Sequence, residues 1–408
     1  MRRALLRAGT ALASLLILEC GVTLLAALQN KTPFPRAAIR ERLFGFPGPG
    51  PGPEHAPHPA WPTDRLHPYL GFVNDPAVDG WGNEQGFSGA VLPPQDAEKR
   101  FSVVLTGGSV ALRLHEHQAE LLRIIRKAFS PGDRKVELSY WALGGFKQPQ
   151  QLMTLSLMLA LGARPDVVLA LDGFNEVALP YAENLPRRVP VEFPREWDLH
   201  TARAVGLRSA IRLGMLSLLA ERRHGLRMLF RQAPFRWSST ALFAWDNLDR
   251  ILQASQQRIE GEFQDRTADR SAGAPEKERV LEDSVRLWKE SSLQMARLCA
   301  ANGIAYRQFL QPNQYHEGSK PLSRKEVRIM SAKDRWTADV RLAVRAAYPQ
   351  LVAQGSALRK QGVAFHDLTQ IFRAEHRTLY VDNCCHLNRQ GNRLLIDAMG
   401  RALTDGAP

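Results

Sequence analysis

Cysteine is scarce in this sequence, and several common features are missing altogether. Four cysteines among 408 residues exclude a fold held together by disulfide bonds. The chain has no zinc-finger spacing, no Lys/Arg-rich tail and no aromatic RNA-binding motif, so we expect no nucleic-acid partner. It also has no visible internal repeat. Hydrophobic residues make up 44% of the chain and charged residues 23%, and these ordinary values exclude a wholly disordered or fibrous protein.

Acidic residues are the minority among the charged ones. Aspartate and glutamate total 41 against 54 lysines and arginines, which gives a formal net charge of +13. A charge of that size permits contact with anionic lipid or an acidic glycan as well as with nucleic acid. The net charge does not distinguish among these partners, because most of the positive charge is arginine spread along the chain.

One long apolar run is present, at residues 8–28, and its only charge is Glu19. Three arginines precede it. About twenty helical residues span the roughly 30 Å of a bilayer's hydrocarbon core, so we predict an uncleaved transmembrane anchor over residues 1–30. A cleaved signal peptide is the alternative. The head before the run is too short to hold a domain, so the rest of the chain is expected outside the cytoplasm.

Proline and glycine separate the predicted anchor from the globular part. Residues 47–62 read PGPGPGPEHAPHPAWP, a composition that forms neither a helix nor a sheet interior. We interpret residues 31–65 as a linker and residues 66–408 as one large domain. Within that domain, residues 183–273 are interpreted as a helical insertion that forms a cap. Three alternatives stay open for its Arg-rich helix near 205–230: it packs on its own domain, lies on anionic lipid, or lines an entrance for an acidic glycan.

Five short apolar runs predict buried β-strands. The runs lie at 101–105, 136–141, 166–171, 304–310 and 363–368, with helical stretches at 112–129 and 148–161 among the segments between them. Runs of this length without polar alternation suit strands buried on both faces. Strands that alternate with helices predict an α/β fold with a parallel, doubly wound sheet. In such sheets ligands bind beyond the carboxyl ends of the strands.

Small and polar residues follow the first three predicted strands. The sequence TGGS, which ends at Ser109, follows the first strand, Gly144-Gly145 follows the second, and Asn175 comes shortly after the third. A nucleophilic serine needs an exposed hydroxyl, a histidine that takes its proton, and amide donors for the developing oxyanion. Glycines leave backbone amides unhindered. These strand ends are therefore candidates for a nucleophile and its oxyanion donors.

One loop near the C-terminus supplies a histidine and an acid. Residues 380–388 read YVDNCCHLN and contain Asp382 and His386. A histidine beside an acid, at the end of an alternating chain with a serine near its start, is a candidate general base.

Taken together, these segments resemble four blocks of the SGNH (GDSL-like) hydrolase superfamily, in the family's order. TGGS resembles the nucleophile block, and Gly145, with Gly144 as the alternative, resembles the glycine block. GFNE at 173–176 resembles the G-x-N-D/E block, and His386 resembles the terminal histidine block.

The resemblance implies a flavodoxin-like three-layer α/β/α sandwich and acyl transfer from an ester. By that resemblance Ser109 attacks the acyl carbonyl, and His386 acts first as base and then as acid. The backbone amides of Ser109 and Gly145 and the side chain of Asn175 bind the oxyanion. Neither a cofactor nor a metal is implied.

The sequence departs from the family's pattern beside the histidine. The family has an aspartate three residues before its histidine; here that position is Asn383, and Asp382 lies four residues before. Asparagine can orient the ring but cannot supply the negative charge that stabilises an imidazolium. We predict that Asp382 partners His386, with a Ser–His dyad as the alternative.

Two cysteines, Cys384 and Cys385, directly precede the histidine. In an oxidising compartment they pair with each other, or one pairs with Cys299, or both remain ordinary packed side chains. No other nearby cysteine or histidine completes a ligand set, so no metal is predicted.

Two further segments, HPYLGF at 67–72 and NEQGF at 83–87, look like the lead-in of membrane-anchored bacterial members. The prediction is therefore a single-pass inner-membrane protein whose serine esterase domain faces the periplasm. Its expected substrate is an acylated carbohydrate or another ester, above all O-acetyl groups of envelope or exported polysaccharide. The alternatives are an O-acetyltransferase on the same site and a non-catalytic binding or assembly factor of an envelope complex. The oligomeric state is left open.

Overall fold

The structure is a computed structural model that describes most of the chain. It covers residues 64–79, 82–92, 97–200, 207–267, 277–331 and 334–405, with Glu19, Gly21, Arg36, Ile39, Arg40 and Leu43 in addition. Apart from Glu19 and Gly21, the predicted anchor lies outside these residues, as does most of the predicted linker. Among the residues that are described, no helix is both long and apolar enough to cross a membrane. The chain divides into two compact units, one of residues 1–50 and 206–263 and one of residues 51–205 and 264–408.

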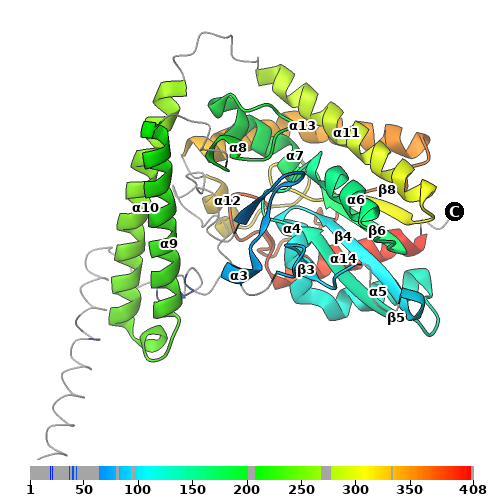
Figure 1. The fold of residues 1–408 in the computed structure, drawn as a ribbon, viewed down its shortest axis with the longest axis horizontal. Coiled ribbons are helices and arrows are strands. Elements are labelled where there is room, and N and C mark those ends of the chain that lie inside the picture. The colour runs from blue at the N-terminus through cyan, green and yellow to red at the C-terminus, as the bar shows by residue number, and fades with distance from the viewer. Residues whose placement is uncertain are drawn as a thin grey trace, which may run out of the picture. The chain divides into compact units, whose positions relative to one another are not determined.

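The larger unit is built on a six-stranded sheet (Figure 1), in the order β3-β5-β4-β6-β7-β8. Its strands are β3 (Ser88–Gly89), β4 (Arg100–Gly107), β5 (Lys135–Ala142), β6 (Val167–Asp172), β7 (Ala305–Leu310) and β8 (Phe365–Asp367). The last five correspond to the five predicted runs and pair in parallel. The α/β fold with a mainly parallel sheet is therefore confirmed.

One edge of the sheet is antiparallel, which the apolar runs did not predict. The short strand β3 pairs antiparallel with β5, with Ser88 opposite Tyr140. A two-residue strand carries no apolar run, so nothing in its sequence marks it. A separate antiparallel pair, β1 (Asp64–His67) and β2 (Gly71–Asn74), precedes the sheet in the chain.

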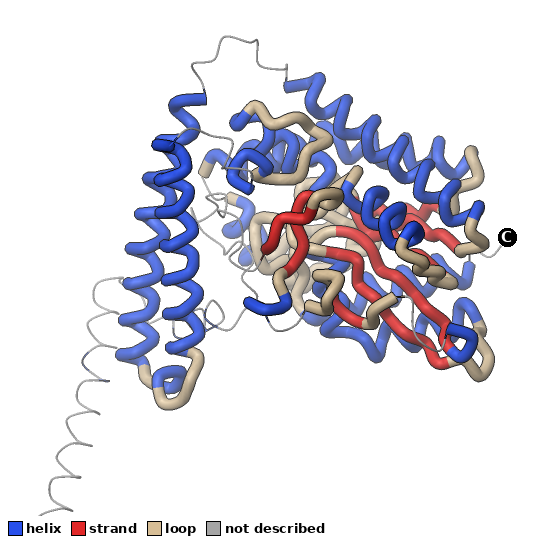
Figure 2. Tube along the Cα trace, viewed as in Figure 1, coloured by secondary structure: helices blue, strands red, loops and turns tan. Residues whose placement is uncertain are grey.

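Helices cover both faces of the sheet (Figure 2). After β5 the chain reverses direction across the sheet, and right-handed crossovers then place helices on opposite faces. On one face α5 (Gln118–Phe129) packs against α14 (Arg389–Asp405). On the other lie α6 (Gln150–Ala160), α7 (Phe174–Leu179), α11 (Lys277–Ala301) and α13 (Arg335–Lys360), which contact one another. The result is the predicted arrangement of a sheet between two helical layers.

The packing between layers is close enough to require small residues. A Cβ on Gly355 of α13 would lie 2.1 Å from the ring of Phe365 in β8, and one on Gly400 of α14 would lie 2.7 Å from Ile124 of α5. Strand β6 reads VVLALD and is buried at every position. A strand covered by helices on both faces needs such an apolar run.

The smaller unit is a pair of long helices. Helices α9 (Leu207–Phe230) and α10 (Ser239–Thr267) are joined by a short turn. Arg223 of α9 donates to Asp249 and Gln256 of α10, and the carboxylate of Glu19 accepts from the backbone N–H of Ser239 at the start of α10. Of this unit's two chain ranges, 206–263 lies inside the predicted insertion and 1–50 lies outside it, whereas residues 183–200 of the predicted insertion belong to the larger unit.

Candidate active site

The candidate nucleophile, Ser109, lies at the carboxyl end of β4, where it begins the short helix α4 (Ser109–Arg113). Both preceding glycines are required by close contacts. A Cβ on Gly107, whose φ is +150°, would lie 2.1 Å from the carbonyl oxygen of Leu171, and one on Gly108 would lie 2.1 Å from Nδ2 of Asn175. The sequence TGGS thus lets the strand end approach β6 and α7, and it brings Asn175 close to the serine.

The structure brings Ser109 and His386 together although 277 residues of chain separate them. The hydroxyl oxygen of Ser109 lies 2.7 Å from Nε2 of His386, and Nδ1 of His386 lies 2.5 Å from Oδ2 of Asp382. Because the carboxylate accepts the Nδ1 proton, Nε2 is the basic nitrogen that accepts the serine proton. The imidazole is 2% exposed and the Asp382 residue 3%.

Asp382, rather than Asn383, is the partner of the histidine. Its second oxygen, Oδ1, accepts from the backbone N–H groups of Cys384 (2.9 Å) and Cys385 (3.2 Å) and of His386 itself (3.3 Å). Asn383 points elsewhere and donates to the hydroxyl of Thr337. The loop therefore turns so that the acid four residues before the histidine faces the ring.

The charge state of His386 suits a general base. Burial and the nearby Arg113 lower its pKa below the ordinary value, while Asp382 acts in the opposite direction. The ring is therefore neutral near pH 7 and ready to take a proton, and the buried carboxylate stabilises the imidazolium that forms.

The candidate oxyanion donors lie on two loops beside the serine. Gly145 follows β5 with a φ of +79°, whereas a Cβ on Gly144 would meet nothing within 4 Å. Gly145 is thus the position that demands glycine. Asn175, in the first turn of α7, donates from Nδ2 to the carbonyl of Phe146 at 2.7 Å. That bond uses one amide hydrogen and leaves the second for a ligand.

Glu176 ties these two loops together, a role that the sequence analysis missed. Its Oε2 accepts from the backbone N–H of Gly173 at 2.7 Å, and its Oε1 accepts from the N–H of Gln148 at 3.2 Å and from Nε2 of Gln151 at 3.1 Å. Burial, and then the neighbouring Asp172, raise the pKa of Glu176 to about 8. The acidic residue at the end of GFNE was the available signal.

The neighbouring Asp172 is bonded to other elements of the sheet unit. None of its described hydrogen bonds goes to Ser109 or His386. Its Oδ1 accepts from Nε1 of Trp288 and from Nε2 of Gln308, both at 2.9 Å. Burial raises its pKa to about 6. These bonds tie the end of β6 to α11 and β7, so Asp172 has a structural role.

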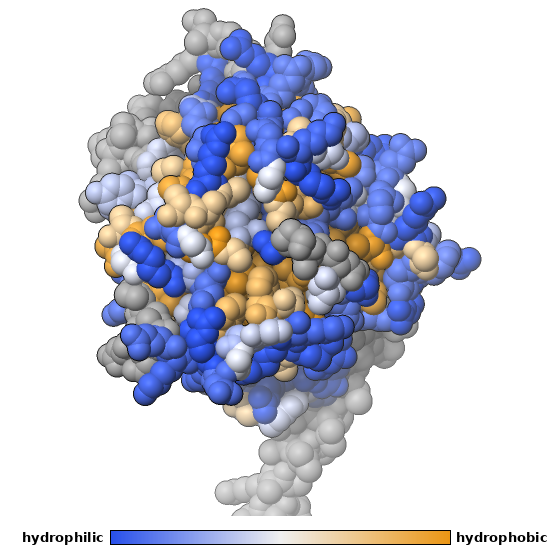
Figure 3. Space-filling model, turned by 90° about the vertical axis from the view of Figure 1, so that its right-hand side faces the viewer, coloured by the Kyte–Doolittle hydropathy of each residue, from blue (hydrophilic) through white to orange (hydrophobic). Residues whose placement is uncertain are grey.

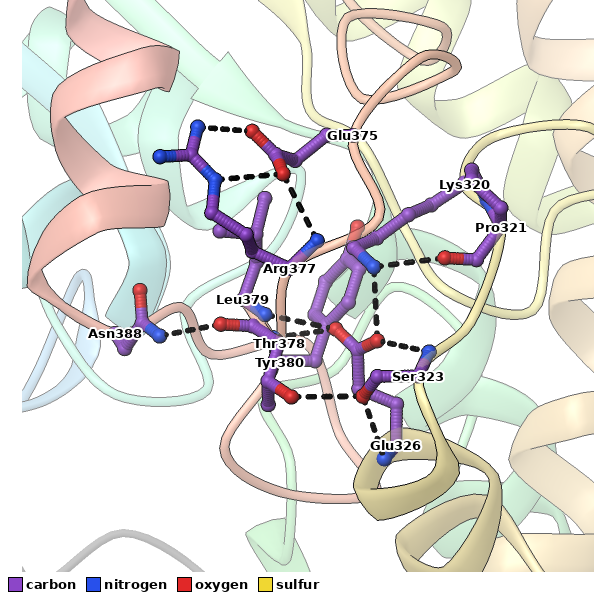
Figure 4. Close-up of polar contacts among 10 residues, drawn as sticks. All are labelled: Lys320, Pro321, Ser323, Glu326, Glu375, Arg377, Thr378, Leu379, Tyr380 and Asn388. Carbon is purple, nitrogen blue, oxygen red and sulfur yellow. Dashed lines mark hydrogen bonds and ion pairs between the residues drawn. The ribbon is translucent and has the colours of Figure 1, made fainter.

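A second buried acid holds the base of the histidine loop (Figure 4). The loop closes through a bridge between Tyr380 and Leu387. Glu326 accepts from the backbone N–H of Leu379 at 2.8 Å and of Tyr380 at 3.0 Å, and it pairs with Lys320 at 2.8 Å. Both members of this ion pair have fully buried side chains. The sequence gives no sign of this clamp, because its partners lie more than 50 residues apart in the chain.

The two cysteines beside the histidine are free thiols. Their sulfur atoms lie 3.5 Å apart, and Cys299 is free and buried as well. Cys384, Cys385 and His386 bring potential ligand atoms within 4.8 Å of one another. Both ring nitrogens of His386 are already bonded, however, so a metal there would displace Ser109 or Asp382. Burial raises the pKa of Cys384 well above its ordinary value, which keeps the thiol protonated.

This arrangement has the parts that acyl transfer needs. A hydroxyl, a neutral imidazole and a fixed carboxylate form one hydrogen-bonded chain, and two loops with amide donors lie beside the hydroxyl. Such a set activates a serine toward an acyl carbonyl.

Comparison with known proteins adds a limited set of similarities. No family model and no curated protein sequence matches the chain. It is similar to the solved structures of a putative acylhydrolase from Bacteroides fragilis (9% identity, TM-score 0.32, 81% of this chain and 92% of that one) and a GDSL-like lipase from Bacteroides thetaiotaomicron (10%, 0.33, 78% and 93%). It is also similar to the acetyl xylan esterase AlAXEase (13%, 0.32, 74% and 98%).

Proposed function

We propose that this chain is a serine esterase that works through an acyl-enzyme on Ser109. The observation that carries the proposal is the continuous chain of hydrogen bonds from the hydroxyl of Ser109, through the buried imidazole of His386, to Asp382. A structural role alone does not account for a neutral buried histidine between a serine and a carboxylate that three backbone amides hold in place.

The proposed reaction follows from the geometry. The oxygen of Ser109 attacks the acyl carbon while Nε2 of His386 takes its proton, and the carbonyl electron pair moves to the oxygen. The amides of Ser109 and Gly145 and the side chain of Asn175 bind that oxyanion. The electron pair then returns from the oxyanion to reform the carbonyl, the bond from the acyl carbon to the alcohol oxygen breaks, and the imidazolium gives its proton to the leaving alcohol. Water repeats the sequence and releases the acid.

The proposed substrates are O-acyl groups, above all O-acetyl groups, of envelope or exported polysaccharide. This part of the proposal is supported by the apolar run at residues 8–28, which would tether the enzyme to the inner membrane with its domain in the periplasm. An O-acetyltransferase would use the same acyl-enzyme with a sugar hydroxyl in place of water. A non-catalytic binding factor would keep the fold without turnover.

A hydrolysis assay on the full chain in detergent tests the proposal. The wild type is expected to hydrolyse p-nitrophenyl acetate, and Ser109→Ala to abolish the reaction. A serine-directed phosphonate is expected to leave its adduct on Ser109, as located by mass spectrometry. Activity that survives Ser109→Ala contradicts the assignment, and an inactive but folded wild type supports the binding role. Faster release of p-nitrophenol when a sugar acceptor is added identifies the transferase.

A further inference from the structure

Arg195 lies directly against the glycine of the proposed oxyanion loop. A Cβ on Gly145 would lie 2.1 Å from Cδ of Arg195 and 3.1 Å from its Nη1. The arginine side chain therefore passes over the α-carbon of Gly145. Among the guanidinium nitrogens, Nη1 is the one beside the backbone that carries a proposed oxyanion donor.

The guanidinium is held in this position by carboxylates. Nη2 donates to Oε1 of Glu183 at 3.0 Å and lies 3.8 Å from Glu196. Glu183 is itself fixed by the indole N–H of Trp336 at 3.2 Å. Burial opposes the charge of Arg195, but Glu183 and Glu196 outweigh it and raise its pKa. The group is thus a permanent, pre-oriented cation.

Part of this cation's donor capacity is unused in the described part of the chain. Nε of Arg195 is buried and has no hydrogen-bond partner there, and the ion-pair bonds involve Nη2. Within the described residues no hydrogen bond or ion pair uses Nη1 either, and this nitrogen lies beside the proposed oxyanion loop. Nη1 is therefore available to donate to a bound substrate.

The surrounding charge favours an acceptor that becomes negative only during the reaction. Arg195 and the buried Lys147 are two cations, and the carboxylates that act on them include Glu183, Glu192 and Glu196. Because these charges offset one another, the surroundings hold no excess positive charge for a permanently anionic group. A transient oxyanion is stabilised by a fixed donor and does not need an excess of positive charge around it.

We propose that Arg195 contacts the substrate and donates from Nη1 to the acyl oxygen of the ester as the tetrahedral intermediate forms. The proposal rests on the proposed esterase function and adds a fourth donor to that oxyanion site. The bond from the Ser109 oxygen to the acyl carbon forms, the carbonyl electron pair moves to the oxygen, and the serine proton goes to His386. Arg195 transfers no proton; its positive charge stabilises the oxyanion.

Steady-state kinetics with p-nitrophenyl acetate on the full chain in detergent test this role. Arg195→Ala is expected to lower kcat roughly 100-fold, as for the loss of other oxyanion donors, with KM little changed. Arg195→Lys keeps the charge and is expected to lose less. Added guanidinium ion is expected to restore part of the lost kcat in Arg195→Ala and none in Ser109→Ala.

A matched control is Arg134→Gln. Arg134 also pairs with a carboxylate, Asp166 at 2.6 Å, but it lies at the amino ends of the strands, and its loss is expected to leave kcat unchanged. An unchanged kcat in Arg195→Ala overturns the proposal. The proposal is also overturned if kcat of Arg195→Ala falls, added guanidinium does not restore it, and the melting temperature falls in parallel. A wild type without Ser109-dependent turnover overturns the esterase function itself, and is recognised before any Arg195 variant is compared.

Discussion

At the scale of single residues, the site depends on which side chain faces the imidazole. The hydrogen bonds of Asp382 to three successive backbone amides set the carboxylate in place before any substrate binds. Asn383 is occupied by Thr337. The side chains of Asp382 and Asn383 therefore have different roles although the two residues are adjacent in the chain.

We expect Asp382→Ala to lower kcat about 10⁴-fold, as for the loss of such an acid in other serine triads. Asn383→Ala removes a bond to Thr337 outside the triad, so it is expected to cost far less turnover. The comparison needs only esterase kinetics and melting curves of the two variants. Equal losses, or a larger loss in Asn383→Ala, would contradict the assignment of Asp382.

The pH dependence of turnover follows from the same residue. The base must be neutral, and burial together with Arg113 lowers the pKa of His386. The acid limb of kcat/KM is therefore expected below pH 6.5, the ordinary value for histidine, with a plateau near neutrality. Arg113→Gln removes a cation that disfavours the imidazolium, so it should move the limb to higher pH. Arg123→Gln, which breaks an exposed pair with Asp397, is the control and should not move the acid limb of kcat/KM. Equal pH profiles in the two variants would contradict the role of Arg113 in lowering the pKa of His386.

At the scale of elements, buried carboxyl groups hold the loops that follow the strands at one edge of the sheet. Strands β4, β5 and β6 end in the TGGS turn, the Gly145 loop and the start of α7. Glu176 joins the second loop to the third, and Glu326 holds the loop of His386. Most of the donors to these two acids are backbone amides, which fix the loops directly.

Glu176→Gln is expected to lower kcat roughly tenfold through misplaced oxyanion donors, part of the 10²–10³-fold effect of losing one outright. Three donors converge on the two carboxyl oxygens of Glu176, and an amide nitrogen cannot accept any of them. A measured fall in kcat with little change in KM would support this, and Glu278→Gln on the exposed start of α11 is the control. A kcat equal to that of the control would refute the clamp.

Glu326→Gln should act on stability. Removing one member of a buried pair costs roughly 3 kcal/mol, seen as a lower free energy of unfolding in urea at pH 7. Hydrogen bonds from Lys320 and the backbone overcome burial and lower the pKa of Glu326. Its contribution is therefore present above the unfolded value of about 4.5 and is lost as the pH falls through the lower folded value. The difference in free energy of unfolding between Glu326→Gln and the wild type should shrink below pH 4.5. A difference that stays constant with pH would argue against the ionised pair.

At the scale of the whole molecule, the chain combines a sheet-based unit with a separate helical pair. Figure 3 shows a face on which strongly hydrophilic residues lie around and between hydrophobic ones. Scattered apolar exposure of this kind is normal for a globular surface and does not itself mark a docking site. A membrane location therefore rests on residues 8–28.

The predicted anchor gives an expected result in cell fractionation. The wild type is expected in the membrane fraction and to resist alkaline extraction. Leu16→Arg places a charge in the centre of the apolar run, at a cost of about 3 kcal/mol on insertion scales, and should shift protein to the soluble fraction. Leu66→Arg, at an exposed position of β1, should not. A Leu16→Arg protein that remains membrane-bound would contradict the anchor.

The sequence by itself determined the parallel strands, the turn glycines and the serine and histidine of the candidate site. Apolar runs and glycines report local burial and local backbone conformation, and both are properties of neighbouring residues. Only the tertiary structure decided between Asp382 and Asn383, added the antiparallel β3, and showed the roles of Glu176, Glu326 and Arg195. Those depend on hydrogen bonds and contacts between loops that are distant in the chain, such as Arg195 over Gly145, and no local pattern records which loops meet.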